Sequence, residues 1–273
     1  MTDRVGNTTE LVLVRGGGDL ATGVAICLHQ SGYKVIVTEL AQPLVVRRKV
    51  AFAEAVFEGQ IEVEGVLGVL AESTCQIATI HTQNAVAVVV DPNLEQLVSL
   101  DFLAIVDARM LKDSTRVRCD KPMKVIGLGP GFVGGKNCIA AIETNRGEDL
   151  GKIIYRGAPQ KDTGVPSMVE GRGLERVLYS PIEGEVIPDV EIGSIVHQGQ
   201  LLVKVGEVPV FAPFDGVVRG MLRAGSSVSK HTKIGDVDPC LEQNRAYELS
   251  DKAVIIGRAV VQVVFMMKAR KAL

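Results

Sequence analysis

The sequence predicts an α/β fold, a Rossmann-like parallel sheet with helices, followed by a small all-β domain. Three observations lead to this prediction. Apolar runs of strand length alternate with helix-like segments up to about residue 170. A glycine-rich turn joins the first strand-like run to the first helix-like segment. From about residue 171 the chain changes to short Val- and Gly-rich runs that contain a repeat. The predicted domains are therefore 1–170 and 171–250, with a C-terminal helix over 251–273.

The strand-like runs of the first domain are apolar almost throughout, which is typical of a parallel sheet buried on both faces. They are Leu11–Arg15, Lys34–Glu39, 85–92, 101–108 and 124–132. Pro, Gly and Asn punctuate the helix-like segments between them, which are Leu20–Ser31, Pro43–Phe57, 93–100 and 137–145. Residues 60–80 alternate like a strand or a hairpin.

The second domain contains two similar halves that match without a gap at an offset of 32 residues. The matched positions are Pro181 with Pro213, Gly184 with Gly216, Val186 with Val218, Gly193 with Gly225 and Val196 with Val228. Two halves that cannot bury their own apolar faces can close over one core. The pattern resembles the halves of biotinyl and lipoyl carrier domains, which implies a barrel-sandwich hybrid. Lys204 stands in the hairpin between the halves without an attachment triplet. A structural or docking module is therefore expected.

The glycine-rich turn predicts a cofactor-binding loop made of Gly16, Gly17, Gly18 and Asp19. A strand precedes it and a helix follows, so backbone N–H groups at the helix start can face a phosphate. Glu39 ends the next strand, 21 residues after Gly18, where an acid can accept a ribose hydroxyl. That acid favours NAD over NADP, and Arg47 and Arg48 are expected on a solvated helix face. The alternative is a strand–helix turn with no ligand.

A second glycine-rich loop runs from Gly127 to Gly135. Gly129 and Gly131 can adopt positive φ beside Pro130, as in an anion-binding nest. The alternative is a rigid loop that packs on the first domain.

Composition excludes several classes of protein. A net charge of −2 and the absence of Trp argue against nucleic-acid binding. The apolar segment Ala259–Met267 is too short to cross a membrane. Five scattered Cys predict reduced thiols in a cytoplasmic protein, and no metal site is expected. The four His lie far apart and no catalytic constellation emerges, so the catalytic residues stay unknown.

The motifs "VRGGGDLATGVA", "GYKVIVTEL", "VIGLGPGFVGGKN" and "AIETNRGEDLG" resemble the selenium-dependent molybdenum hydroxylase accessory proteins of the YqeB type. The family pattern differs at Glu148, where a His is common, and at Cys240, where an Arg is common. The chain is also distantly similar to the xanthine dehydrogenase accessory proteins. The resemblance implies a maturation role, a molybdenum hydroxylase as partner, and a small phosphate-bearing ligand at the glycine loops. An NAD-like dinucleotide and the molybdenum cofactor are the candidate cofactors, and a homo-oligomer is left open.

Two alternatives to the accessory role stay open. One is an NAD-dependent oxidoreductase, for which Asp107 and Lys112 are the nearest proton-relay candidates. The other is a non-catalytic scaffold whose glycine loops are empty.

Overall fold

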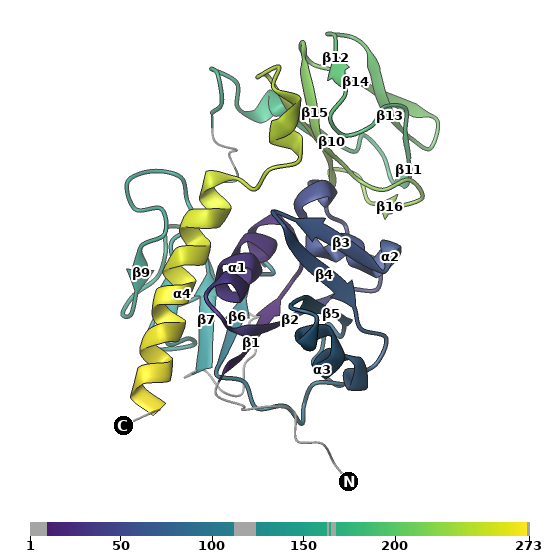
Figure 1. Ribbon diagram of the computed structural model, residues 1–273. Helices are drawn as coiled ribbons and strands as arrows, with labels where there is room; N and C mark the ends of the chain where they lie inside the picture. Colours follow the sequence, from purple (N-terminus) through teal and green to yellow (C-terminus); the bar gives the residue numbers. More distant parts are fainter. Residues whose placement is uncertain (1–9, 112–123, 163, 165–167, 272–273) are drawn as a thin grey trace.

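The computed structural model describes residues 10–111, 124–162, 164 and 168–271. Within them a nine-stranded sheet has the order β3-β4-β5-β2-β1-β6-β7-β8-β9 (Figure 1). Pairs from β4 to β8 are parallel, whereas β3 and β9 pair antiparallel with β4 and β8. In chain order the strands are Leu11–Arg15, Lys34–Glu39, Gln60–Val63, Val66–Leu70, Val86–Val90, Ala104–Asp107, Val125–Leu128, Ala140–Ile142 and Ile153–Ile154.

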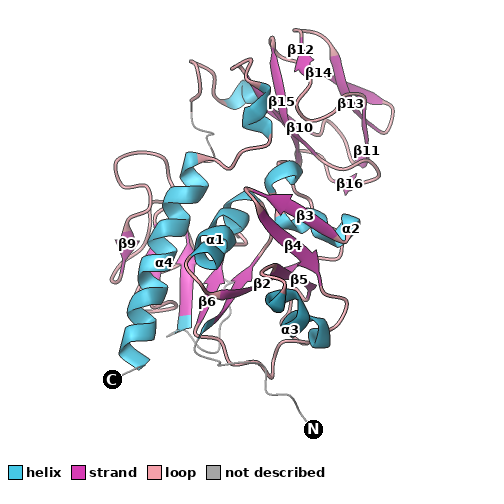
Figure 2. Ribbon diagram, in the orientation of Figure 1, coloured by secondary structure: helices cyan, strands magenta, loops and turns pink. Residues whose placement is uncertain are grey.

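Helices cover both faces of this sheet. α1 (Asp19–Gln30) and α4 (Asp251–Lys271) lie side by side on one face, and α3 (Thr74–Thr82) lies on the other (Figure 2). α4 is the last element of the chain, yet its buried side chains join those of β1, β2 and α1 in the largest core cluster. The sheet region is therefore completed by residues from both ends of the sequence.

α1 and α4 run parallel and touch through glycines. A Cβ on Gly23 would lie 2.7 Å from the Ala253 Cβ, and one on Gly257 would lie 2.6 Å from the Cys27 Sγ. One helical turn separates the two contacts on each helix, so the helices keep the same register over this length. The glycines therefore allow the two helices to approach more closely than larger side chains would permit.

Gly257→Val is expected to lower the free energy of unfolding by about 1–3 kcal/mol, because the added atoms overpack a filled interface. One of those atoms would also approach the carbonyl oxygen of Gly23, 2.8 Å from an ideal Cβ. Urea denaturation measures the change. Gln262→Val, at an exposed position of the same helix, is the control and should cost less than about 0.7 kcal/mol. Equal losses in the two variants would contradict the close helix contact.

The β region that follows contains two four-stranded antiparallel sheets, ordered β10-β17-β15-β12 and β14-β13-β11-β16. In chain order, β10 to β17 are Val177–Tyr179, Gly184–Pro188, Ile195–Val196, Leu201–Val205, Val208–Phe211, Gly216–Met221, Ser227–Val228 and Lys233–Asp238. Strands 32 residues apart occupy corresponding places, so each position of one sheet has a counterpart in the other. The two sheets share one apolar core.

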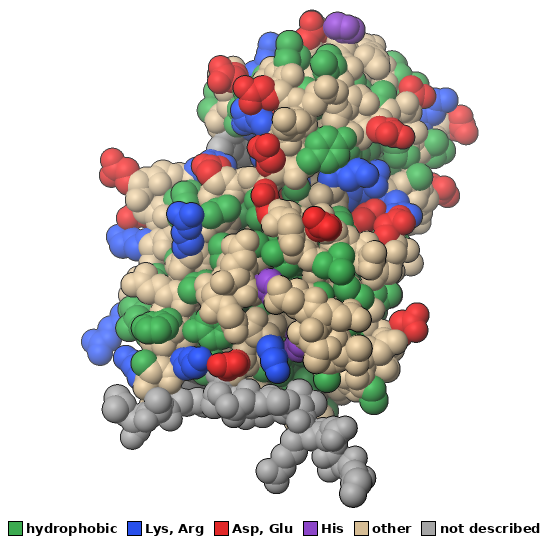
Figure 3. All heavy atoms as spheres, viewed as in Figure 1, with side chains coloured by type: hydrophobic (Ala, Val, Ile, Leu, Met, Phe, Trp, Pro, Cys, Tyr) green, Lys and Arg blue, Asp and Glu red, His purple; other side chains and the backbone are tan. Residues whose placement is uncertain are grey.

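The β region is fastened to the sheet region by polar contacts. The amide of Met221 donates to the Val46 carbonyl at 2.9 Å. Arg223 makes ion pairs of 2.7 Å with Glu54 and 2.6 Å with Glu58. Acidic and basic side chains gather on the surface where the two regions meet (Figure 3).

The predicted fold class needs correction. The large sheet is mixed, because residues 60–70 form the antiparallel hairpin β3–β4 and β9 adds an antiparallel strand at the other edge. The predicted helix over 137–145 is wrong, since its apolar centre forms β8, buried between β7 and β9. A short continuous apolar run is compatible with a buried strand as well as with a buried helix. The apolar run here is shorter than a typical helix, which favours the strand.

The predicted helix over Pro43–Phe57 is also wrong. The segment contains two 3-10 turns, Arg48–Val50 and Phe52–Glu54, and ends in the four-residue helix α2 (Ala55–Glu58). Its backbone is paired with other elements. The amide of Phe52 donates to the Thr22 hydroxyl at 2.8 Å, and that of Ala53 donates to the Gly17 carbonyl at 2.9 Å. These partners compete with the helical hydrogen bonds.

Residues 93–100 form turns in place of the predicted helix. The Asp91 carboxylate accepts the amides of Glu95, Gln96 and Leu97 at 2.8–3.1 Å, which holds the segment as a capped turn. The helix predicted over Leu20–Ser31 and the strands Leu11–Arg15 and Lys34–Glu39 are confirmed, the helix to within one residue at each end.

Candidate functional site

The glycine turn lies where β1 meets α1, and each glycine has a different role. Gly16 has φ of +95°, and a Cβ there would stand 3.3 Å from the Arg109 backbone. A Cβ on Gly17 would stand 2.9 Å from the amide nitrogen of Ala53. Gly18 has an ordinary φ of −66°, and no atom lies within 4 Å of the place its Cβ would take. Gly16 is favoured by its positive φ and Gly17 is required by packing, whereas Gly18 leaves open space.

Glu39 closes one side of this turn. Its two carboxylate oxygens accept the amides of Gly17 and Leu40, each at 2.7 Å. The predicted ribose-side acid is thus held against the loop by the backbone. A carboxylate has about four lone-pair sites, so acceptor capacity is left for a hydroxyl-bearing ligand.

A pocket of about 750 Å³ opens above the turn. Its polar wall includes Gly16, Gly18, Asp19, Glu39 and three cations contributed by distant segments. These cations are Arg47, Arg109 and Lys233. The apolar part of the lining is formed mainly by Leu40, Leu44, Val45, Val46, Pro92, Met110 and Leu111. The pocket therefore suits a ligand with a charged and hydroxylated end and an apolar remainder.

Arg109 is positioned by the strand that ends next to β1. Its Nε and Nη2 donate to the two oxygens of buried Asp107, at 2.9 and 2.5 Å. Arg15, at the end of β1, lies 3.8 Å from the same carboxylate. The bidentate pair fixes the guanidinium plane at the pocket wall.

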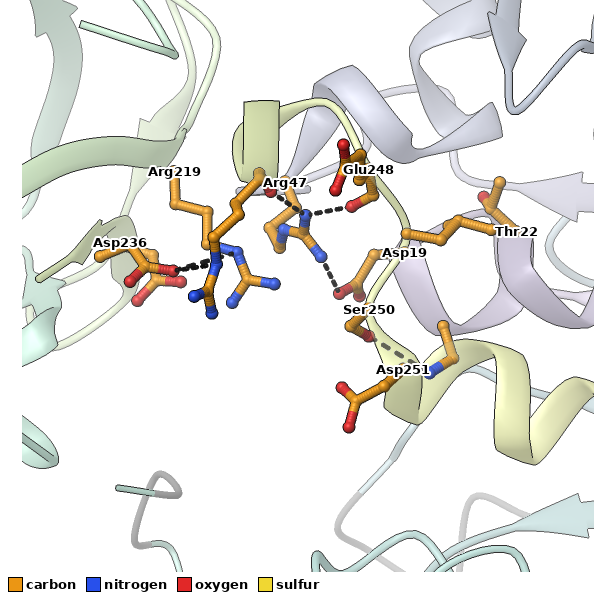
Figure 4. A network of polar contacts seen from close by, with 12 residues as sticks. Asp19, Thr22, Arg47, Arg219, Asp236, Glu248, Ser250 and Asp251 are labelled. Atoms are coloured by element: carbon orange, nitrogen blue, oxygen red, sulfur yellow. Dashed lines mark hydrogen bonds and ion pairs between the residues drawn. The ribbon is translucent and has the colours of Figure 1, made fainter. Parts of the chain in front are cut away.

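Arg47 is buried, with 7% of its surface exposed, so the expectation that it lies on a solvated face is wrong. Its Nη2 donates to the carbonyls of Arg245 and Glu248 at 3.1 and 2.8 Å, and its Nη1 lies 3.7 Å from Asp19 (Figure 4). Burial, and then the like charge of Arg219, lower the pKa of Arg47 to about 10. Asp19 is an unusual residue in a glycine turn that could bind an anion. The nearby Arg47 guanidinium offsets the negative charge of Asp19 at the edge of the pocket.

The second glycine loop has a different environment. Gly129 and Gly131 have positive φ, but neither is among the residues that line the pocket. A Cβ on Gly129 would lie 2.6 Å from the Thr144 hydroxyl, and the Phe132 ring lies against Gly127. The structure thus brings the first loop and Glu39 together, and leaves Gly129 and Gly131 in a loop outside the pocket.

Sequence reasoning missed Arg109 and Lys233 as lining residues, and it misplaced Arg47. Arg109 follows a strand end, which is a usable signal in parallel sheets. Lys233 carries no signal, because it comes from the β region. Lys112 and Cys119 lie outside the described residues. Within the described ranges, no three His, Cys, Asp or Glu side chains gather as a metal site would require. Among those same ranges, no helix is long and apolar enough to span a membrane.

A second acidic residue, Asp251, lies at the start of α4 and is shown with Asp19 in Figure 4. Asp251 accepts two hydrogen bonds from Arg146, at 2.8 and 2.6 Å, and these bonds lower the pKa of Asp251 to about 2. A carboxyl group with a depressed pKa stabilises the fold above its ordinary pKa of about 4, and this contribution is lost as pH falls toward 2. The loss unlinks α4 from the loop that carries Arg146.

Asp251→Asn is therefore expected to lower the free energy of unfolding by less than about 1 kcal/mol at pH 7, because the pair is largely exposed. The difference from the wild type should shrink between pH 4 and pH 2. Thermal melts across this range measure it. A difference that stays constant down to pH 2 would contradict the ion pair.

Comparisons with known proteins give one clear sequence relative. The chain is 42% identical over 258 residues to the uncharacterized protein YqeB of Escherichia coli (strain K12), which covers 94% of this chain and 48% of that protein. The chain thus spans about half the length of the curated relative it matches. This similarity supports the YqeB-type part of the resemblance and carries no information on selenium-dependent hydroxylases. No family model matches the chain.

Three solved structures show weak likeness. An aspartoacylase family protein from Mesorhizobium loti is 13% identical with a TM-score of 0.28, and covers 84% of this chain and 85% of its own. The ectoine utilization protein EutE from Ruegeria pomeroyi is 13% identical with a TM-score of 0.24, over 84% of this chain and 57% of its own. A succinylglutamate desuccinylase/aspartoacylase from Rhodobacter sphaeroides is 12% identical with a TM-score of 0.24. The match covers 84% of this chain and 85% of that protein's chain.

The molybdenum hydroxylase accessory role expected from the resemblance is not carried further, because the sequence relative is an uncharacterized protein.

Proposed function

We propose that the pocket at the end of β1 binds a small hydroxylated organic anion, a sugar phosphate or a sugar acid. The observation that carries the proposal is that one pocket is lined by the open Gly18, the start of α1, Glu39, Arg109 and Lys233. These groups offer an anion and a hydroxyl group separate partners.

The anionic group is best accommodated at the start of α1. The first hydrogen bond within the helix runs from the Thr22 amide to the Gly18 carbonyl at 2.8 Å, so the amides of Asp19, Leu20 and Ala21 precede it. Free N–H groups and the positive end of the helix dipole attract an anion at this point. Gly18 leaves the approach open, because it has no side chain.

Hydroxyl groups are best accommodated at Glu39. Its carboxylate is oriented by two backbone amides, so it is ready to accept further donors without losing side-chain freedom. A phosphate and a carboxylate are both anions that the helix start can bind. The ligand class is therefore defined by an anion and a hydroxyl on one small skeleton.

Isothermal titration calorimetry of the full chain tests the proposal. The probes are ribose 5-phosphate and gluconate, with ribose and inorganic phosphate as controls that carry only one of the two features. We expect one of the anionic sugars to bind with 1:1 stoichiometry, and at least about tenfold more tightly than either control, since each charge-assisted hydrogen bond contributes about 1.5–3 kcal/mol. The stronger of the two probes identifies the anion. Absence of binding by both sugars at millimolar concentration would overturn the proposal.

A further inference from the structure

The two halves of the β region differ at the turn that faces the pocket. In the first half, Gly199 precedes β13 with φ of +80°. Its counterpart 32 residues later is His231, which has φ of +67° before β17. Glycine adopts this conformation freely, whereas an L side chain is strained in it. The second half thus keeps the backbone of the first at a position where glycine would be the relaxed choice.

The hydrogen bonds of the two turns are the same. In the first half, the Gly199 amide donates to the Ala212 carbonyl at 2.9 Å, and the Ala212 amide donates to the Gln200 carbonyl at 2.8 Å. In the second half, the His231 amide donates to the Ser180 carbonyl and the Ser180 amide to the Thr232 carbonyl, both at 2.8 Å. The turns are therefore equally well held, and only their side chains differ.

The difference in side chains follows the difference in surroundings. Leu201 in the first half pairs with Phe211 across the sheet, and Lys233 in the second half pairs with Tyr179 at the equivalent position. The corresponding Lys233, together with Thr232, lines the pocket above the glycine turn. An apolar sheet residue in one half is thus replaced by a cation at the pocket in the other.

Lys233 also differs from the other two cations of the pocket. Arg47 faces Asp19 and Arg109 is paired with Asp107. Lys233 has no carboxylate partner within the part of the chain that the structure describes. A cation of this kind, exposed at a pocket wall, is available to a ligand.

We infer that Lys233 is a specificity-determining residue of the pocket, and that it selects ligands by their negative charge. The inference rests on the proposed function. The β region then completes the binding site, since its 229–233 turn supplies a cation to the pocket that the start of α1 also lines.

Calorimetry with Lys233→Gln tests the inference. We expect ribose 5-phosphate or gluconate, whichever binds the wild type, to bind about tenfold more weakly, because a charge-assisted contact is lost. Its affinity should also fall less steeply with added salt than in the wild type. Uncharged ribose should bind both proteins equally. Lys230→Gln is the matched control, since Lys230 is exposed on the same turn and does not line the pocket.

His231→Gly separates side-chain chemistry from the shape of the turn. Glycine takes the same φ and keeps the amide that donates to Ser180, so we expect binding within about twofold of the wild type and an unchanged or higher melting temperature. A loss of binding in this variant would overturn the assignment of the effect to Lys233.

The outcomes distinguish the two proposals. Equal affinity of Lys233→Gln and the wild type, with binding abolished by Gly18→Asp, overturns the inference and leaves the proposed function intact. Failure of both sugar anions to bind the wild type overturns the proposed function and the inference together. Tenfold loss in Lys233→Gln with no loss in Lys230→Gln supports both.

Discussion

Replacement of Phe52 by alanine is expected to lower the free energy of unfolding by about 3–5 kcal/mol, the usual cost of truncating a fully buried aromatic side chain. Phe52 is completely buried, and its ring lies directly on β4, where a Cβ on Gly68 would stand 2.5 Å from it. Its amide is bonded to the Thr22 hydroxyl of α1. Phe52 therefore joins the hairpin β3–β4 to the first helix.

Urea denaturation followed by far-ultraviolet circular dichroism measures this loss. Phe211→Ala is the matched control, because Phe211 is 50% exposed on β14 and should cost less than about 1 kcal/mol. Similar losses in the two variants would contradict the packing of the 43–57 segment. That segment also carries Leu44 and Arg47 into the pocket, so its anchoring is a condition for the site.

Gly18→Asp is expected to weaken binding of the sugar anion by about 100-fold or more, since a carboxylate then occupies the place of the ligand's anion and like charges repel it by several kcal/mol. The fold should tolerate the change. The φ of Gly18 is ordinary, its Cβ would meet no atom within 4 Å, and aspartate is a favoured residue at a helix N-cap. The melting temperature should be equal to that of the wild type or higher.

Gly18→Asn is the matched control for Gly18→Asp. Asparagine also caps the helix and has the same shape and reach as aspartate, but it carries no charge. We expect a smaller loss of affinity in this variant. Equal losses would show that bulk, and not charge, governs the site. Unchanged binding in both variants would contradict a ligand at the start of α1.

The parts of the fold that could be predicted from the sequence are those fixed by neighbouring residues. β1, the turn Gly16–Gly18 and α1 follow one another directly in the sequence. An apolar run, a glycine turn and a helical period are therefore sufficient to predict all three. Glu39 was found because the distance between strand ends in a β-α-β unit is nearly constant. These are the residues of the candidate site that lie in a single local motif.

The errors have one physical origin, which is that distant partners decide the local structure. The backbone of the 43–57 segment is bonded to Gly17, Thr22 and Met221, none of which its own sequence indicates. Residues 140–142 form a strand because β7 and β9 lie on either side. Lys233 reaches the pocket only because the β region docks on the sheet region. No local pattern carries this information.

The most direct test of the site is the position of the bound ligand. Titration of ¹⁵N-labelled full chain with the sugar anion that calorimetry identifies should shift the amide signals of Gly16–Ala21, Leu40, Arg109 and Lys233. These residues line the pocket or bond to Glu39. We expect these shifts to saturate together and to be absent in Gly18→Asp. Shifts confined to the second glycine loop, Gly127–Gly135, or no shifts at a saturating concentration, would contradict it.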